Sequence, residues 1–216
     1  MLHSTSSGSD LRERLVRGLS ALPDAITAAG FLLLWCFPLA FGPDAVRNGI
    51  LLALVEFVTI HASVMLGHFA FSAEPARTRK AASLAIFGGF YTLFVGGFAL
   101  AFRAWWPVFG FGWLLAAKFA AVFASPADNA QRLKELRATW GVSVLIYLGA
   151  VFLTSMFPVP RLGISAAVRG QLDLPGSGLW IEEPHRLIAF GVLYFGLLSW
   201  SRWRGWKLPE NLPVSR

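Results

Sequence analysis

The chain has 216 residues, of which 56% are hydrophobic and only 14% are charged. Soluble domains carry about a quarter charged residues, so this composition excludes an ordinary soluble domain. The net charge of +7 does not indicate a nucleic-acid partner, because the lysines and arginines lie between apolar blocks instead of forming one stripe.

The apolar blocks predict membrane-spanning helices. A helix needs about 20 apolar residues to cross a bilayer core of about 30 Å. Six stretches come close to this length: residues 24–42, 48–72, 81–102, 105–125, 139–157 and 186–203. The sequence therefore predicts an all-α integral membrane protein with a six-transmembrane-helix bundle at 24–203. Its expected surroundings are the lipid bilayer and, in addition, a membrane-protein partner or a second copy of the chain.

The segment 1–23, ahead of the first predicted span, has leucines at helical spacing and arginines on the other side. The leucines are Leu11, Leu15, Leu19 and Leu22, and the arginines are Arg12, Arg14 and Arg17. This pattern is typical of an N-terminal amphipathic helix at the membrane interface. A signal peptide is the alternative, because Ala40-Phe41-Gly42 resembles a cleavage site, but the charged region ahead of it is too long.

The positions of the cations predict the orientation, since short loops rich in Lys and Arg stay in the cytoplasm. With six spans, most of the 19 lysines and arginines fall on the side of the two termini. The opposite side holds only Arg47, Arg103, Arg161, Arg169 and Arg186. Both termini, including the tail 204–216, are therefore predicted in the cytoplasm, with a bacterial inner membrane as the expected location.

The third and fourth predicted spans carry small residues at every fourth position. These are Gly88, Thr92 and Gly96 in one span, and Gly112, Ala116, Ala120 and Ala124 in the other. Small residues let helix backbones approach closely in lipid. The two spans are therefore predicted to pack as an antiparallel hairpin through these stripes.

The second predicted span holds most of the ionisable residues inside the membrane. Glu56 is the only acidic residue well inside any span, and an ionised side chain at the bilayer centre costs at least about 2.5 to 3.5 kcal/mol. At about 100° per residue, two polar faces result. One face holds Glu56, Thr59 and Ser63, and the other holds His61, Met65 and His68. Because neither face can be turned to lipid at low cost, this span is predicted to be central in the bundle.

A second group of ionisable residues precedes the last span, at Glu182, Glu183 and His185. Acidic residues suit the first turn of a helix, so capping alone explains them in one interpretation. In the other, Glu183 and His185 meet Glu56 in an outward-facing polar site that binds a divalent metal ion or handles protons. The long connection 158–179 is then either a lid over this site or a loose turn.

The remaining polar residues allow several alternatives. His61, Met65 and His68 have the spacing of a soft-metal site or one side of a haem site, although no other span offers a second mid-membrane histidine, and structural histidines are more common. Lys118 either snorkels to the interface or pairs with a carboxylate.

The rival functions are a cofactor-free transporter or channel component, with Thr59, Ser63 and Lys118 lining its pathway beside Glu56, and a structural or assembly subunit. The standard nucleotide-binding, serine-hydrolase and zinc-protease motifs do not occur, so the sequence leaves open whether the protein is an enzyme. The single cysteine, Cys36, excludes an intramolecular disulfide.

Overall fold

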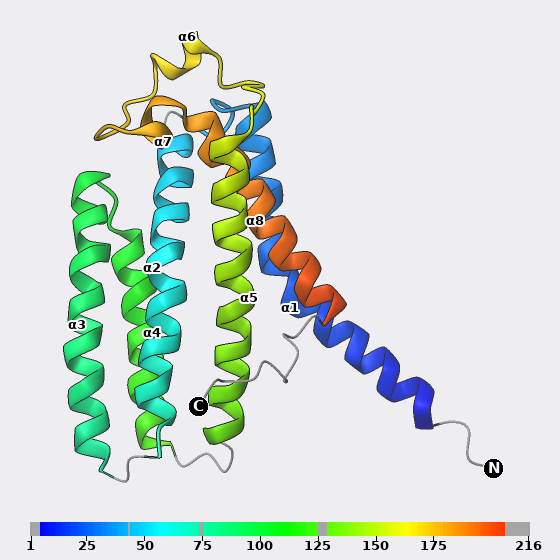
Figure 1. Ribbon diagram of the computed structural model, residues 1–216, viewed down its shortest axis with the longest axis vertical. Coiled ribbons are helices and arrows are strands. Elements are labelled where there is room, and N and C mark those ends of the chain that lie inside the picture. The colour runs from blue at the N-terminus through cyan, green and yellow to red at the C-terminus, as the bar shows by residue number, and fades with distance from the viewer. Residues whose placement is uncertain (1–4, 43, 74–75, 125–128, 206–216) are drawn as a thin grey trace.

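The computed structural model describes residues 5–42, 44–73, 76–124 and 129–205, and these residues form helices and their connections without any strand. The helices are α1 (Thr5–Cys36), α2 (Ala45–Phe71), α3 (Arg77–Ala101), α4 (Trp106–Phe123), α5 (Asn129–Met156), α6 (Ala166–Arg169), α7 (Leu179–Glu182) and α8 (Pro184–Arg204). The long helices alternate in direction along the chain (Figure 1). We call the end at the top of Figure 1, where α6 and α7 lie, the upper end, and the opposite end the lower end.

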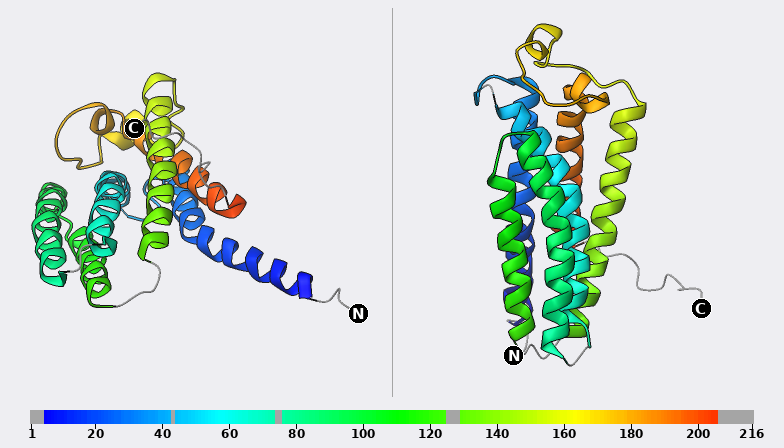
Figure 2. Two further views of the ribbon diagram at one scale, coloured as in Figure 1. Left: turned by 60° about the horizontal axis from the view of Figure 1, so that its bottom comes forward. Right: turned by 90° about the vertical axis from the view of Figure 1, so that its left-hand side faces the viewer.

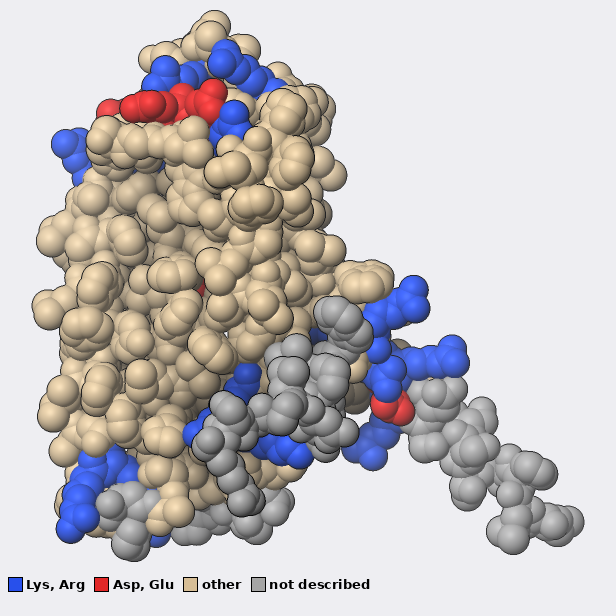
Figure 3. Space-filling view, in the orientation of Figure 1, with Lys and Arg blue, Asp and Glu red and all other residues tan. Residues whose placement is uncertain are grey.

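Five helices are long and apolar enough to cross a membrane: α1 from Leu11 onward, α2, α3, α4 and α5. This agrees with a polytopic membrane protein. The sixth predicted span, α8, is not among them, because its 21 residues include His185 and Arg186 at one end and Arg202 and Arg204 at the other, which shortens its apolar part. Figure 3 shows the resulting surface, with Lys and Arg gathered toward the two ends and a wide uncharged band between them.

Helix α2 is central, as its two polar faces predict. It contacts each of the other long helices, α1, α3, α4, α5 and α8. Two of its glycines lie at close approaches: a Cβ atom at Gly49 would lie 3.3 Å from Ile188 of α8, and one at Gly67 would lie 2.1 Å from Leu136 of α5. Small residues in α2 thus let its neighbours pack tightly around it.

Helices α3 and α4 form the predicted antiparallel hairpin, but the predicted contact surface is only half right. Gly88 of α3 receives the side chain of Leu115, which would lie 2.6 Å from a Cβ atom at that position. On α4, however, Gly112, Ala116 and Ala120 are exposed, and a large side chain of α4 fills the space that Gly88 leaves. The small-residue stripe of α4 therefore faces outward.

Helices α1 and α8 form an antiparallel pair that diverges from the bundle of α2 to α5 toward the lower end (Figures 1 and 2). The pair is held by aromatic packing. The rings of Phe31 and Phe195 stack with centroids 5.6 Å apart. Phe31 also packs against Gly191, where a Cβ atom would lie 2.2 Å from its ring.

The boundaries of two predicted segments differ in the structure. The amphipathic segment 1–23 is not a separate helix, because α1 continues through Pro23 and its exposed leucine stripe runs on in register to Ile26. Helix α1 ends at Cys36, before Gly42, and Gly42 has a φ of +94° in the turn that follows. At the other end of the chain, 206–216 of the predicted cytoplasmic tail lie outside the described residues.

Candidate functional site

A pocket of 170 Å³ with both polar and apolar lining residues lies between α2, α5 and the last turns of α8. We call it the Glu56 pocket. Its polar lining residues are Glu56, Thr59, Ser63, Thr139, Ser143 and Arg202. The predicted polar face of α2 is thus brought together, and residues of α5 and α8 complete the site. Because a water molecule takes about 30 Å³ in the liquid, the pocket has room for a few waters among these hydroxyl groups.

The carboxylate of Glu56 is held by a tyrosine. The hydroxyl group of Tyr194 in α8 donates a hydrogen bond of 2.9 Å to Glu56 Oε1, and Tyr194 is fully buried. The ring of Tyr147 in α5 packs edge-on against Tyr194 at 5.3 Å, and its hydroxyl group donates to the carbonyl oxygen of Ala53 at 3.2 Å. No cation among the described residues forms an ion pair with Glu56, so its direct partner is a neutral hydroxyl group.

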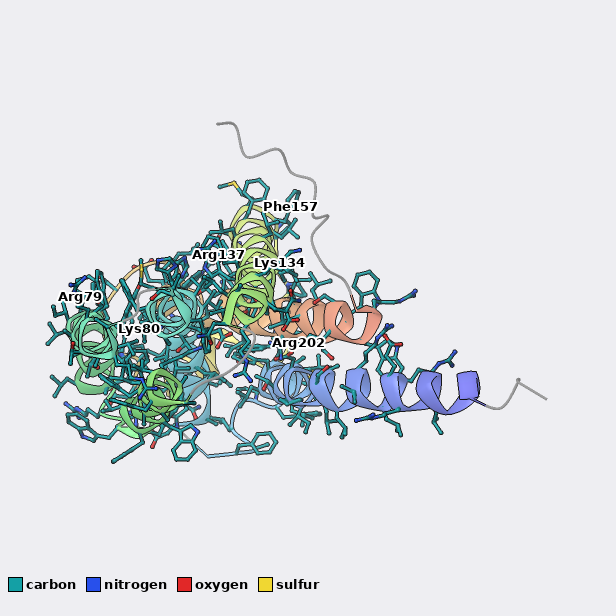
Figure 4. All side chains as sticks on the ribbon, turned by 90° about the horizontal axis from the view of Figure 1, so that it is seen from below. Arg79, Lys80, Lys134, Arg137, Phe157 and Arg202 are labelled. Carbon is teal, nitrogen blue, oxygen red and sulfur yellow. The ribbon has the colours of Figure 1, made fainter. Side chains whose placement is uncertain are left out.

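An ion pair between α1 and α8 borders the Glu56 pocket. Arg202 Nη1 lies 2.7 Å from Asp24 Oδ2, and Asp24 is only 7% exposed. Near this ion pair, Ser199 donates a hydrogen bond of 3.0 Å to the carbonyl oxygen of Ala21. Seen from below, Arg202 lies between α8 and α1, on the side of α5 (Figure 4). The guanidinium group that lines the pocket is therefore already engaged by a carboxylate of another helix.

The structure does not bring Glu56 together with Glu183 and His185. The latter two line a separate pocket of 240 Å³ at the upper end, which we call the upper pocket. Tyr194, the partner of Glu56, follows His185 by nine residues in α8, or about 13 Å at a rise of 1.5 Å per residue. Among the described residues, no three His, Cys, Asp or Glu side chains form a group that could hold a metal ion.

Arg186 fixes the position of Glu183, a role that the sequence pattern alone does not predict. Its guanidinium group donates to the carbonyl oxygens of Thr154, Ser155 and Phe157 at 2.9, 3.2 and 3.0 Å, and it also binds the Glu183 carboxylate. The last carbonyl groups of a helix lack partners within the helix, so Arg186 caps the end of α5. The hydrogen bond from Arg186 lowers the pKa of Glu183 below its ordinary value.

The histidines of α2 each have a local partner instead of a shared ligand. His61 Nδ1 lies 2.8 Å from the carbonyl oxygen of Phe57, and Trp140 of α5 packs edge-on against its ring. Arg137 Nη2 donates to His68 Nδ1 at 3.1 Å. Met65 is 38% exposed. These contacts agree with structural histidines on the side of α2 that faces α5.

Lys118 does not line the Glu56 pocket. Its ammonium group lies 5.5 Å from the centre of the Phe71 ring, at the end of α2. This position agrees with snorkelling toward the lower end. The pathway residues predicted beside Glu56 are therefore reduced to Thr59 and Ser63.

Three residues of the site could not be inferred from the sequence alone. Tyr194 and Arg202 reach Glu56 and its pocket from α8, and Asp24 reaches Arg202 from α1. The only available signals were a tyrosine inside the last predicted span and an acidic residue at the start of the first. The order of polar and apolar residues in α1, α2 or α8 does not determine which helices lie side by side.

No protein-family model, no curated protein and no solved structure matches this chain. Its function therefore has to be argued from the geometry of the site.

Proposed function

We propose that the chain is a six-span protein of a bacterial inner membrane in which Glu56 takes up and releases a proton from the cytoplasmic side. The proposal has two parts. The first is the topology, with α8 as the sixth span and both termini in the cytoplasm. The second is proton exchange at Glu56 through the Glu56 pocket.

The topology rests on the course and packing of α8. This helix lies against α1, α2 and α5, and it buries Leu187, Phe190, Tyr194 and Leu198 among them. A helix that is largely covered by protein needs less apolar surface than one that faces lipid. Its direction continues the alternation of the other long helices (Figure 1), so a span by α8 returns the chain to the side of the N-terminus.

The distribution of cations supports the cytoplasmic assignment of the lower end. Arg79 and Lys80 lie in the first turn of α3, and Lys134 and Arg137 lie in the first third of α5; both helices begin at the lower end (Figure 1). Lys80 also donates a hydrogen bond of 2.8 Å to the carbonyl oxygen of Ser72 at the end of α2. Short connections rich in Lys and Arg stay in the cytoplasm.

The observation that carries the proton proposal is a carboxyl group inside a span whose direct partner is a neutral hydroxyl group. Glu56 accepts its hydrogen bond from Tyr194, while the nearby Arg202 is engaged by Asp24. An ionised carboxylate without a paired cation is costly inside a membrane, and binding a proton removes that cost. The free energy of the charged form of Glu56 therefore depends on its surroundings, and we expect the carboxyl group to exchange a proton when those surroundings change.

The pocket provides a route for that proton. Hydroxyl groups both donate and accept hydrogen bonds, so Thr59 and Ser63 of α2 and Thr139 and Ser143 of α5 can order a chain of waters. Ser63 lies two turns below Glu56 on α2, and Thr139 lies in the first half of α5, which starts at the lower end. The route therefore leads from Glu56 toward the cytoplasmic side, opposite to the outward-facing site predicted from the sequence.

Infrared difference spectroscopy of the protein in liposomes tests the proposal. A carboxyl C=O band that appears and disappears as the pH is changed is expected in the wild type and in Glu135→Gln, since Glu135 is exposed on α5. The other 11 Asp and Glu residues also contribute to this band, so only the component that Glu56 contributes is expected to be missing in Glu56→Gln. If wild type and Glu56→Gln give the same difference spectrum over the whole pH range at which the protein stays folded, proton exchange at Glu56 is excluded.

A second candidate function is a small transporter or channel component without a cofactor. The observation that favours it is that Glu56, Thr59 and Ser63 line one pocket. It predicts a flux across liposome membranes, driven by a pH gradient or a membrane potential, that is lost in Glu56→Gln and kept in Glu135→Gln. Proton exchange at Glu56 without such a flux would support the first proposal and exclude the transporter or channel.

A further inference from the structure

The upper pocket lies far along α8 from Glu56, and nothing in the proposed function uses it. The connection between α5 and α8 and the first residues of α8 enclose it. Its polar lining residues are Arg161, Ser165, Arg169, Glu182, Glu183 and His185. At 240 Å³ it holds a group several times the size of a water molecule, which takes about 30 Å³ in the liquid.

His185 is a buried residue whose ring has no hydrogen-bond partner among the residues that the structure describes. It is 5% exposed and lines the upper pocket, and none of the described residues forms a hydrogen bond with its ring. Buried polar groups are almost always hydrogen-bonded, and an imidazole ring has two nitrogen atoms to satisfy. The open hydrogen-bonding capacity of His185 indicates a ligand or waters in the pocket.

The charges around His185 favour an anionic ligand. Arg161 and Arg169 are exposed, and neither forms an ion pair with a described residue. The carboxylate of Glu183 is already bound by Arg186, which leaves Glu182 as the only lining carboxylate that no described arginine binds. Guanidinium groups outnumber the available carboxylates, and the space between them has the chemistry of an anion site.

A phosphate group matches these donors best. A guanidinium group presents paired N–H donors at the spacing of phosphate oxygens. Two arginines, the His185 ring and the hydroxyl group of Ser165 line the same pocket and can all donate hydrogen bonds to an anion. Ser165 accepts a hydrogen bond of 3.3 Å from the backbone N–H of Val168, so its own hydroxyl proton remains available.

We propose that the upper pocket binds a phosphate group through Arg161, Arg169, Ser165 and His185. The pocket lies beyond the last turn of α5 and at the first turn of α8, where Figure 3 shows acidic side chains beside Lys and Arg. In the proposed topology this is the level at which the headgroups of the surrounding bilayer begin. The phosphate group is therefore either a soluble phosphate or the phosphodiester of a lipid headgroup.

Binding to the purified protein in detergent tests the proposal with three probes. Inorganic phosphate is titrated by calorimetry, and short-chain phosphatidylglycerol and the matching diacylglycerol are added in native mass spectrometry. Saturable binding of phosphate, or of phosphatidylglycerol without diacylglycerol, is expected. Arg161→Gln and Arg169→Gln are each expected to weaken it about tenfold or more, because each removes charge-assisted hydrogen bonds. Arg103→Gln is the control, since Arg103 is exposed in the turn between α3 and α4 and does not line the pocket.

The outcomes separate the two sources and the failure of the proposal. Binding of inorganic phosphate identifies a soluble phosphate site, and binding of phosphatidylglycerol alone identifies a headgroup site. Absence of saturable binding for both probes, or an equal loss in Arg103→Gln and Arg169→Gln, overturns the proposal. Because Arg161 and Arg169 are exposed, their variants are expected to fold, and Glu56 is not involved in either result.

Discussion

Replacing Arg186 by Gln is expected to detach the end of α5 from the start of α8. The guanidinium group holds the carbonyl oxygens of Thr154, Ser155 and Phe157. Glutamine is too short and has too few donors to reach all three. The effect of this change on the free energy of unfolding can be worked out from how much of each carbonyl group water can reach.

The three hydrogen bonds do not count equally. Phe157 is exposed, so water replaces the arginine there at little cost. Thr154 is a buried residue, and its carbonyl oxygen accepts the shortest of the three hydrogen bonds, at 2.9 Å, which is itself partly buried. Leaving a buried acceptor unsatisfied costs about 1 to 3 kcal/mol. The total loss in Arg186→Gln is therefore expected to be about 1 to 3 kcal/mol, dominated by Thr154.

Equilibrium unfolding in mixed detergent and SDS measures this change in the free energy of unfolding. Arg103→Gln serves as the control, because Arg103 is an arginine at the upper end that is exposed, unlike the half-buried Arg186, and it donates to no carbonyl group of a described residue. Arg186→Lys is expected to fall between wild type and Arg186→Gln, since an ammonium group keeps the charge but cannot fork. If Arg186→Gln unfolds with the same free energy as Arg103→Gln, Arg186 does not cap α5 and the reasoning is wrong.

Two further predictions concern the α1–α8 pair and the upper end. Gly191→Ala is expected to destabilise the protein by about 1 to 3 kcal/mol in the same assay, because the new methyl group would overlap the Phe31 ring, whereas Gly196→Ala has open space and is expected to be near neutral. Equal effects of the two would contradict the close packing of the pair. The hydrogen bond from Arg186 lowers the pKa of Glu183 in the folded protein. This interaction therefore stabilises the folded protein fully above the ordinary glutamate pKa of about 4.3, and the stabilisation is lost as the pH falls through the lower pKa of the folded state. Unfolding curves between pH 7 and pH 3 are expected to show a smaller loss of stability with acid in Glu183→Gln than in wild type, and identical pH dependence would contradict the interaction.

The architecture was largely predictable because a membrane imposes strong patterns on sequence. All six predicted spans overlap long helices, and the two polar faces of α2 correctly indicated its central position. The spacing of residues along a helix does not determine which side chains of a neighbouring helix pack against each of its faces. Gly88 contacts Leu115 and not the small-residue stripe of α4, because packing depends on which large side chain fills which gap.

In the candidate site, too, the sequence predicts which residues share a face of one helix but not their partners on other helices. The helical spacing of Glu56, Thr59 and Ser63 predicts a shared face, and the three residues line one pocket in the structure. The hydrogen bond from Tyr194 depends on how far down α8 lies beside α2, and no property of either helix alone determines that register. For the same reason the sequence does not show that Glu183 lies away from Glu56. Glu183 precedes Tyr194, the residue of α8 that contacts Glu56, by 11 residues in the chain.

The most direct test of the account is whether the carboxyl group of Glu56 exchanges a proton. The measurement is the infrared difference spectrum of the protein in liposomes as the pH is changed, compared between wild type, Glu56→Gln and Glu135→Gln. The account predicts a component of the carboxyl band that is present in wild type and Glu135→Gln and missing in Glu56→Gln. A carboxyl band in Glu56→Gln that equals the wild-type band at every pH would contradict it.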